Sequence, residues 1–480
     1  MRHMRRDIPY FQTDSQELSV KDIMSVIMKH KKYEAKYKKN EDYYDGKHKI
    51  LEREFADPTK PNNKVVVDLP AYTVDIRVGY FSGEPVSFRS VNEEQNNMIQ
   101  DLLKYNDFQE VNSELDTLSS IYGHAFLVVY LDEDGNIRFG VDDPYNTLVI
   151  HDSTIEHNII GALRYYEYED VIDGMDKIRI TLYTKKSIQQ LDGPINAPQL
   201  ISSDINIFGE IPIIEFMENS ARCGSFEKHI SIVDAIESIM SNNINEIDYF
   251  DNAYLHLKGV VDDINELNYL EGDPFGDMKN NRVLVTLADG GAEFLTKNIN
   301  DVYIQNTLNR LTDDYHKLTK TPALNNETFG NASGVALRYK LFNLEKDLNK
   351  KESKWRKSIQ RLIDVVNNIW TLKGHKFNPY DVTVTFTRSL PNNEAEMADI
   401  VTKLNGIVSR RTLLSQLDFI EDVEAEIEQL DKELRLNELT IPEEIRNDEI
   451  SRSRMINKLS IDKEAPDNKE NNTEENNDEE

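Results

Sequence analysis

The dominant pattern in the chain is a stripe of apolar residues at helical spacing between Gly334 and Gly374. The stripe advances in steps of four and three with one gap, and Glu352, a candidate for a kink, lies in that gap. No proline or glycine interrupts it. At about 1.5 Å per residue the helix would be about 50 Å long, so we expect it to pack in a core and to extend into contact with neighbouring subunits. The stripe consists of Leu337, Leu341, Leu344, Leu348, Trp355, Ile359, Leu362, Val366 and Ile369.

An amphipathic helix is predicted within residues 15–39. Ser19 and Asp22 have capping-box spacing, and Ile23 and Ile27 form an apolar seam. The end of this segment is rich in lysine. This end fits either a surface helix whose cations complement the helix dipole or an arm that contacts DNA or the capsid.

Residues 121–216 change to a strand pattern. Short β-rich runs follow one another with no helical pattern between them, and Asp134-Gly135 is a strong hairpin signal. We therefore expect an antiparallel sheet. The runs are Ala125–Tyr130, Asn136–Phe139, Leu148–Ile150, Gly161–Tyr168, Lys177–Tyr183 and Ile211–Phe216.

Two further helices are predicted around a small α/β insert. Phe226–Leu257 and Asn300–Lys320 have apolar seams, and the insert between them contains strands at Arg282–Leu287 and Ala292–Thr296. The second helix leads into a polar loop, Thr321–Gly334, which opens into the long helix. After a strand at Val382–Thr387, three short helices and a terminal segment rich in Asp, Glu and Asn follow. The fold class is therefore α+β.

Composition limits the possible partners. The 480-residue chain has a net charge of −30 at pH 7, which argues against tight wrapping of DNA but permits DNA to pass through a channel. Its single cysteine, Cys223, excludes an internal disulfide and fits a reducing cytoplasm. The N-terminus does not resemble a signal peptide, and the apolar run Ala125–Leu131 is too short to cross a membrane. We expect a soluble intracellular protein.

No motif for catalysis, cofactor binding or metal binding is found. The chain has no P-loop, no G-x-G-x-x-G, no G-x-S-x-G and no H-E-x-x-H sequence. Acidic pairs such as Asp142-Asp143 and Asp313-Asp314 leave one enzymatic alternative, a metal-dependent nucleic-acid-processing enzyme with an unrecognised carboxylate site. A third alternative is a binding protein that joins the subunits of a larger assembly and forms no channel. We expect no enzyme activity, no cofactor and no metal.

Several strings, in order over residues 40–435, resemble the portal proteins of tailed bacteriophages, in the branch of siphophages with Gram-positive hosts. The first are Tyr43-Tyr-Asp-Gly-Lys-His-Lys-Ile50 and Asn63-Lys-Val-Val-Val-Asp-Leu69. Further similar strings are Val78–Pro85, Ile121–Phe126, Asp143–Asn146, Gly209–Phe216, Ser333–Leu337, Ser389–Glu394 and Glu421–Glu424.

The resemblance implies a ring, typically of twelve copies, at one capsid vertex. Double-stranded DNA would be packaged and ejected through it. Implied partners are the terminase large subunit, the major capsid and scaffolding proteins, and a head-completion or connector protein, with no membrane. The ring would belong to the virion and assemble in the host cytoplasm. The implied parts are an N-terminal arm and wing (1–225), a stem helix (226–257), the clip (258–298), a second stem helix (299–320), the tunnel loop (321–334), the long wing helix and strand (335–390), the crown (391–460) and a disordered acidic tail (461–480).

The resemblance also implies where DNA would meet the protein. The stem would line the channel with carboxylates that repel phosphate and let DNA slide: Glu237, Glu246, Asp248, Asp251 and Asp313. The tunnel loop would offer short, uncharged side chains to DNA: Asn325, Asn326, Thr328, Asn331 and Ser333. Alternatively, the loop only caps the long helix through Ser333. Lys317 and Lys320 would either form basic rings at the loop or complement the C-terminal dipole of their own helix.

Overall fold

The computed structural model describes residues 8–15, 17–58, 60–250, 254–258, 283–286, 291–295, 301–323, 334–389, 401–414 and 423–440. The chain divides into two compact units, Met1–Pro391 and Asn392–Glu480. In the second unit the described elements are α12 (Arg410–Leu414) and α13 (Val423–Thr440). Ser409 caps α12, since its hydroxyl accepts a hydrogen bond from the Thr412 N–H at 3.3 Å.

A six-stranded sheet in the first unit has the order β1-β5-β6-β7-β8-β9. All neighbouring strands are antiparallel except β1 and β5, which are parallel. Helix α1 (Val20–His30) packs on it through Ile23 and Ile27, and Ser19 and Asp22 form the predicted capping box. The strands are β1 (Phe11–Gln12), β5 (Thr147–His151), β6 (Ile159–Glu169), β7 (Asp176–Tyr183), β8 (Ser187–Pro194) and β9 (Gln199–Ile205).

The largest core surrounds the long helix α10 (Gly334–Leu372). Trp355 is fully buried between the rings of Phe81 and Phe216. Helix α10 contacts the antiparallel sheet β10-β3-β4, and the pair β2–β14 contributes to the same core. The strands are β2 (Ser87–Ser90), β3 (His124–Leu131), β4 (Ile137–Asp142), β10 (Ile213–Met217) and β14 (Val382–Thr385).

Three helices between the N-terminal region and β3 complete this core: α3 (Leu69–Ser82), α4 (Glu93–Tyr105) and α5 (Phe108–Tyr122). Gly123 ends α5 in the left-handed region, at φ 95°. A Cβ atom there would lie 2.2 Å from the backbone carbon of Arg222, so only glycine fits. This close approach brings the start of β3 against the segment that follows β10.

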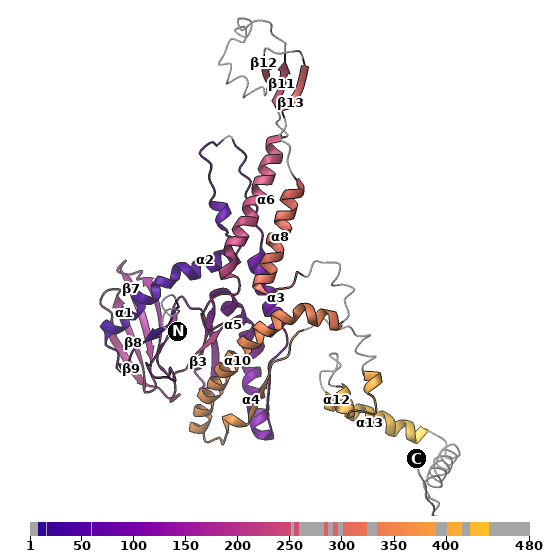
Figure 1. Ribbon diagram of the computed structural model, residues 1–480. Coiled ribbons are helices and arrows are strands. Elements are labelled where there is room, and N and C mark those ends of the chain that lie inside the picture. The colour runs from indigo at the N-terminus through magenta and orange to yellow at the C-terminus, as the bar shows by residue number, and fades with distance from the viewer. Residues whose placement is uncertain are drawn as a thin grey trace, which may run out of the picture. The chain divides into compact units, whose positions relative to one another are not determined.

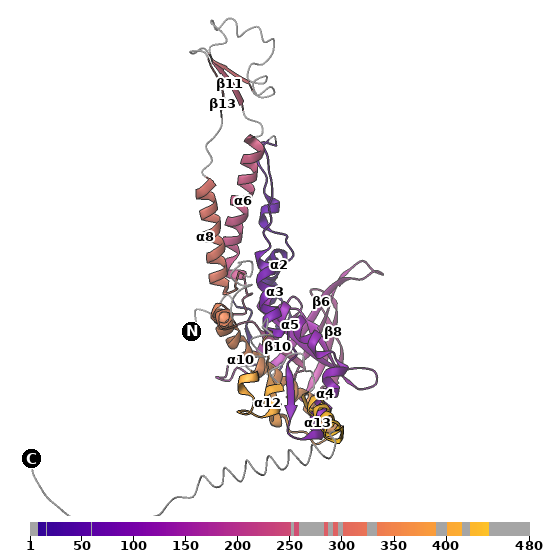
Figure 2. The same ribbon diagram turned by 90° about the vertical axis from the view of Figure 1, so that its right-hand side faces the viewer.

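Helices α6 (Ile230–Phe250) and α8 (Asp301–Thr319) lie side by side and extend away from this core (Figure 1, Figure 2). The chain between α2 (Glu34–Tyr44) and α3 includes the 3-10 turn η3 (Lys49–Glu52) and runs beside α6 in both views. The strands β11 (Tyr254–Lys258), β12 (Val283–Thr286) and β13 (Gly291–Leu295) form a small sheet in the order β12-β11-β13.

Most predicted elements are present. The α+β class, the antiparallel strands, α8 and the long uninterrupted helix are confirmed. Two helices differ from the prediction. The helix expected within residues 15–39 is divided into α1, which begins at Val20, a 3-10 turn at Lys31–Tyr33, and α2, which ends at Tyr44. Helix α6 stops at Phe250 instead of Leu257, and residues 254–258 form β11. The apolar residues of Tyr-Leu-His-Leu-Lys258 continue the helical seam by chance, but their alternation also suits a strand that pairs with β12 and β13.

Candidate functional site

An extended segment of the chain is hydrogen-bonded along one face of α6. The backbone N–H groups of Asn63, Val65 and Val67 donate to side chains of Asn245, Ser241 and Glu237 at 2.7, 2.9 and 2.9 Å. We call residues 62–68 the strap. The strap runs antiparallel to α6, since its residue numbers rise as those of the helix fall.

The regular spacing of these hydrogen bonds arises because two residues of the extended strap cover nearly the same distance as four residues of the helix. Two residues of extended chain advance about 6.6 Å, and four residues of α-helix advance about 6 Å. Alternate strap residues therefore meet every fourth helix residue, and three backbone donors that would otherwise need water are satisfied. Arg53 adds a further tie, because its guanidinium donates to the Asn242 side chain and to the Asn63 carbonyl.

The Tyr43–Ile50 string anchors the chain before the strap to the same helix. The Tyr43 hydroxyl donates to Asp234, and the His48 ring bonds the Glu237 carboxylate through Nδ1 and the Tyr43 carbonyl at 2.8 Å through Nε2. Burial alone would lower the pKa of His48. The hydrogen bonds to Glu237 and Tyr43, with the charges of Glu237 and Asp68, outweigh burial and raise that pKa above its ordinary value.

This arrangement changes the set of candidate channel residues. Glu237 is fully buried and bonded to His48 and Val67, so its carboxylate faces the strap instead of any channel. Asp248 is exposed but accepts a 2.5 Å hydrogen bond from Asn63 on the same face. Glu246 is half-buried, Asp313 is exposed on α8, and Asp251 lies outside the described residues.

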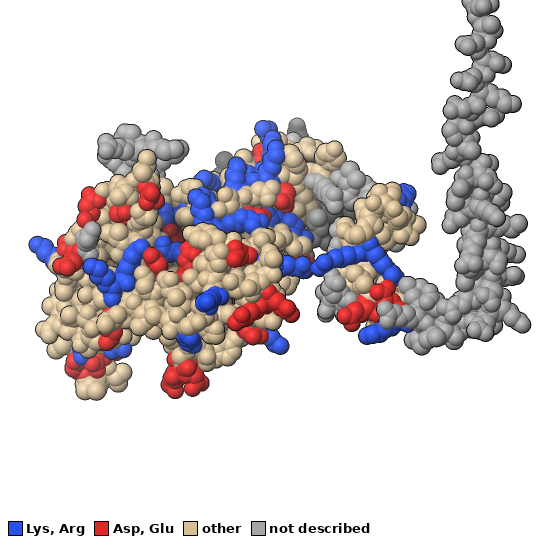
Figure 3. All heavy atoms as spheres, turned by 90° about the horizontal axis from the view of Figure 1, so that it is seen from below, with Lys and Arg blue, Asp and Glu red and all other residues tan. Residues whose placement is uncertain are grey.

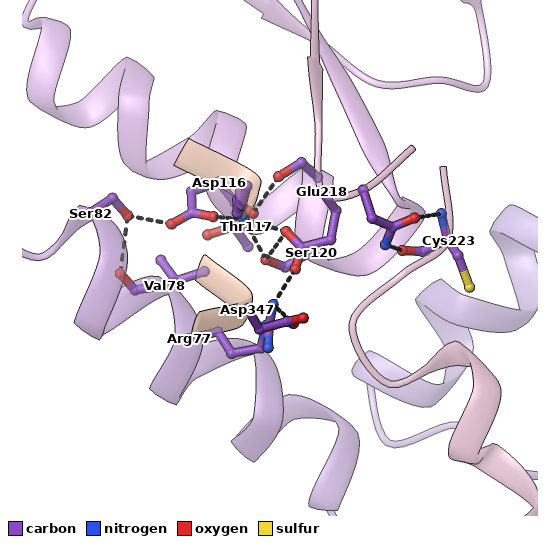
Figure 4. A network of polar contacts seen from close by, with 12 residues as sticks. Arg77, Val78, Ser82, Asp116, Thr117, Ser120, Glu218, Cys223 and Asp347 are labelled. Atoms are coloured by element: carbon purple, nitrogen blue, oxygen red, sulfur yellow. Dashed lines mark hydrogen bonds and ion pairs between the residues drawn. The ribbon is translucent and has the colours of Figure 1, made fainter. Parts of the chain in front are cut away.

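A second polar feature is a buried ionic junction where α3, α5 and α10 meet (Figure 4). We define the junction as Arg77 of α3, Asp116 of α5, Glu218 after β10 and Lys351 of α10. Arg77 donates to Glu218 at 2.6 Å, and Lys351 forms ion pairs with both Asp116 and Glu218. All four side chains are at most 4% exposed. The charges of two cations and two anions, which come from four segments of the chain, thus neutralise one another in the core.

Each junction carboxylate is held by more than one donor. Burial raises the pKa of Asp116, which also accepts a 2.7 Å hydrogen bond from Ser82. For Glu218 burial acts in the same direction, but the positive charges of Lys351 and Arg77 outweigh it and lower the pKa. The junction fixes how α3, α5 and α10 meet.

Lys320 connects the end of α8 to this junction. It follows α8 in the left-handed conformation, at φ 62°, and its ammonium group pairs with Asp347 of α10. Asp347 also pairs with Arg77 at 3.1 Å. Lys320 therefore forms an ion pair within the subunit, and neither a basic ring at the loop nor an interaction with the helix dipole had included this pair. Lys317 is exposed. The loop candidates Asn325, Asn326, Thr328, Asn331 and Ser333 lie outside the described residues.

The sequence analysis missed the junction, although it contained a signal. Lys351 lies three residues after Leu348 and four before Trp355, so it fills the gap in the apolar stripe. A lysine at a stripe position, without a break in the helix, indicates a buried cation that needs anionic partners. The partners are far apart in sequence and carry no motif of their own.

Nothing in the described part of the chain supports a catalytic centre. Within the described residues, no group of three or more His, Cys, Asp or Glu side chains could hold a metal ion. Among those residues, no helix is both long and apolar enough to span a membrane. The ionic groups at the strap and at the junction bind one another, so their chemistry is that of a scaffold.

Comparisons with known proteins agree with this description. The family model for phage portal proteins of the SPP1 Gp6-like type matches residues 24–438. The portal protein of Bacillus phage SPP1 is 25% identical over 422 residues, covering 83% of this chain and 80% of its own length. The portal protein of Clostridium phage phiCD119 is 24% identical over 414 residues, covering 80% and 89%.

A solved structure of the neck of a native GTA particle, computed with C12 symmetry, gives a TM-score of 0.39 at 12% identity. The match covers 73% of this chain and 89% of that chain.

The family model and both curated relatives define the class of this chain as a portal protein of a phage. The chain belongs to the SPP1 Gp6-like family of phage portal proteins. The predicted resemblance and portal function are thereby confirmed, and the enzymatic alternative has no support. Membership of this family implies a place in the virion capsid.

We expect Lys351→Met to destabilise the protein strongly, because it leaves Asp116 and Glu218 buried with only Arg77 as a cation. Removing one partner of a buried pair costs about 3–5 kcal/mol. Urea unfolding would measure the loss. Lys350→Met, at the exposed neighbouring position, is the control and should change stability by less than about 0.5 kcal/mol. Equal stability of the two variants would contradict the proposed role of the junction.

The contact between His48 and Glu237 should make stability depend on pH. The pKa of His48 is raised in the folded state. The contribution of the charged His48 ring to the free energy of unfolding is therefore complete below its unfolded-state pKa of about 6.5, and it is lost as the pH rises through its folded-state pKa. The difference in unfolding free energy between the wild type and His48→Gln should therefore be larger at pH 5.5 than at pH 9. His375→Gln, at an exposed position, should show no such change. A difference independent of pH would mean that His48 contributes only by packing.

Proposed function

We propose that this chain forms a ring of twelve copies at one vertex of a phage capsid and that double-stranded DNA is packaged and ejected through its centre. The match to portal proteins over residues 24–438 is the observation that carries the proposal. The two long helices α6 and α8 suit a channel wall, because the strap and the junction hold them against the body of the same subunit.

The parts of the subunit follow in the order given by the sequence. Residues 1–225 together with 335–390 form the wing, α6 and α8 the stem, 258–298 the clip, 321–334 the tunnel loop and 391–460 the crown, with an acidic tail at 461–480. The structure changes one boundary of this proposal: the first stem helix ends at Phe250, and we extend the clip backward to include β11, which begins at Tyr254. This division is consistent with the compact unit that begins at Asn392.

The channel surface of the stem is the face that the strap leaves uncovered. Glu237 is removed from the proposed channel lining, and Asp248 is set aside because it lies on the strap face. Asp313 and Glu246 remain, together with Asp251 by sequence. A ring repeats every carboxylate once per subunit, so even a few per chain repel phosphate along the whole channel and leave DNA without a deep binding minimum.

The proposed partners are those of a portal vertex. The terminase large subunit would dock at the clip during packaging, and a head-completion or connector protein would take its place afterwards. The wing and crown would meet the major capsid and scaffolding proteins during assembly in the host cytoplasm. The proposal assigns no catalytic step to this chain, so hydrolysis of ATP would belong to the terminase.

The decisive measurement is the mass and shape of the purified protein. Light scattering should give a species of about twelve times the 55.6 kDa chain, and electron-microscope class averages should show a central pore wide enough for duplex DNA. A poreless monomer or dimer at high concentration would contradict the ring. Metal-dependent cleavage of nucleic acid, lost on mutation of Asp313 and Asp314, would instead support the enzymatic alternative.

The tunnel loop can be tested by charge. Replacing Asn325, Asn326 and Asn331 with aspartate should reduce DNA packaging at least tenfold while rings still form, because the new carboxylates would repel phosphate. The control adds the same charge at Asn471, Asn472 and Asn476 of the terminal segment and should package normally. Normal packaging by the loop variant would show that the loop caps the long helix without contacting DNA.

A further inference from the structure

Helix α10 carries a row of cations beside its apolar stripe. Lys354, Lys357 and Arg361 recur at steps of three and four, so they lie along one side of the helix. They line a cleft of about 910 Å³ between α10, the end of β10 and the loop after β5. Seen from below, Lys and Arg side chains gather in one region of the surface (Figure 3).

Arg361 lacks the partner that a shielded guanidinium needs. Its Nε and Nη2 atoms are buried and have no hydrogen-bond partner within the described residues. The carboxylates nearby are engaged elsewhere: Glu210 pairs with Lys185 at 2.7 Å, and Asp364 accepts from Gln360 at 3.3 Å. Burial lowers the pKa of Arg361 despite the charges of both carboxylates. An unsatisfied buried donor is costly, so the cleft favours an incoming acceptor.

Lys354 adds to the excess of positive charge. Burial, followed by the charges of Lys357 and Arg222, lowers its pKa. The Arg222 guanidinium and the Glu215 carboxylate already neutralise one another deeper in the cleft, at 2.7 Å. Glu156, at the rim, accepts from Asn158. A carboxylate from outside would relieve the repulsion among the lysines and could bind the Arg361 fork in a bidentate manner.

A matching anionic surface lies on α4 and α5. Four carboxylates there are exposed and form no ion pair with any described residue: Glu94, Asp101, Glu110 and Glu114. Glu94 and Asp101 are seven residues apart and Glu110 and Glu114 are four apart, so each pair lies on one side of its helix.

We infer that the cleft beside α10 of one subunit receives the acidic side of α4 and α5 of the next subunit in the ring. Two different surfaces of opposite charge on one subunit make a head-to-tail contact, which gives a ring where the rotation between subunits closes and does not give a two-fold dimer. The partner is therefore a second copy of this chain. This inference rests on the proposed ring and names the surfaces that form it.

Charge reversal tests the contact. Variant A carries Lys354→Glu and Lys357→Glu, and variant B carries Glu110→Lys and Glu114→Lys. Each alone should remain monomeric at ten times the concentration at which the wild type assembles, because like charges then face each other. Arg361→Gln should weaken assembly at least tenfold. A control with Lys21→Glu and Lys29→Glu, at exposed positions of α1, should assemble as the wild type does.

Mixing separates a lost contact from a misfolded subunit. In an equal mixture, the acidic cleft of A faces the basic helices of B, and the basic cleft of B faces the acidic helices of A. Mixed rings should therefore form from two variants that form none alone. Light scattering and electron microscopy of the mixture would record this result.

The remaining outcomes overturn the inference in different ways. If the wild type forms rings and A and B do so as well, or if the mixture gives no rings, the contact is wrong but the portal function stands. If A assembles normally but exposes residues 461–480 to protease, the cleft holds the chain's own acidic tail. If A assembles but loses DNA binding, the cleft holds phosphate. A wild type that forms no ring contradicts the proposed function itself.

Discussion

The buried junction of Arg77, Asp116, Glu218 and Lys351 is the constraint on which the rest of the subunit depends. Each charge is expensive to remove from water unless its partners are in place, and the four come from three helices and the end of a strand. The helices and the strand must therefore reach their final positions together. Through Asp347 and Lys320 the same set of charges extends to the end of α8, so the projecting helices share this anchorage.

The strap stabilises the projecting part of α6, which extends away from the main core. The buried apolar residues of α6 lie in its first turns, whereas Ile244 and Ile247 further along are exposed. Its polar side chains Ser241 and Asn245 bind backbone donors of the strap. The agreement between the extended and helical repeats lets this pattern continue without strain. It also decides which side of α6 stays free, and hence which carboxylates could face DNA.

The sequence predicted the elements that periodicity defines and missed those that depend on distant partners. The α10 stripe, α8 and the antiparallel strands follow from local spacing. Strands β8 and β9 were missed because Gln, Ser, Asp and Gly dilute their alternation. No element was predicted for residues 69–122, which form α3, α4 and α5. The burial of Glu237 was equally unpredictable, since it depends on His48, 189 residues away in the chain. No local rule encodes such a pair.

Helix α10 shows why ions, and not leucines, occupy the junction. Its buried side carries Trp355 and Ile359 for stability, and the adjacent side carries the cations that we assign to the next subunit. Well-packed apolar residues would often be as stable as a buried ion pair, but they would tolerate a sliding or rotated helix. Lys351 bonded to both Asp116 and Glu218 fixes the rotation of α10 about its axis. A small rotation would move Arg361 and Lys357 away from a neighbour, so a ring contact made from this helix requires an internal contact that sets its angle.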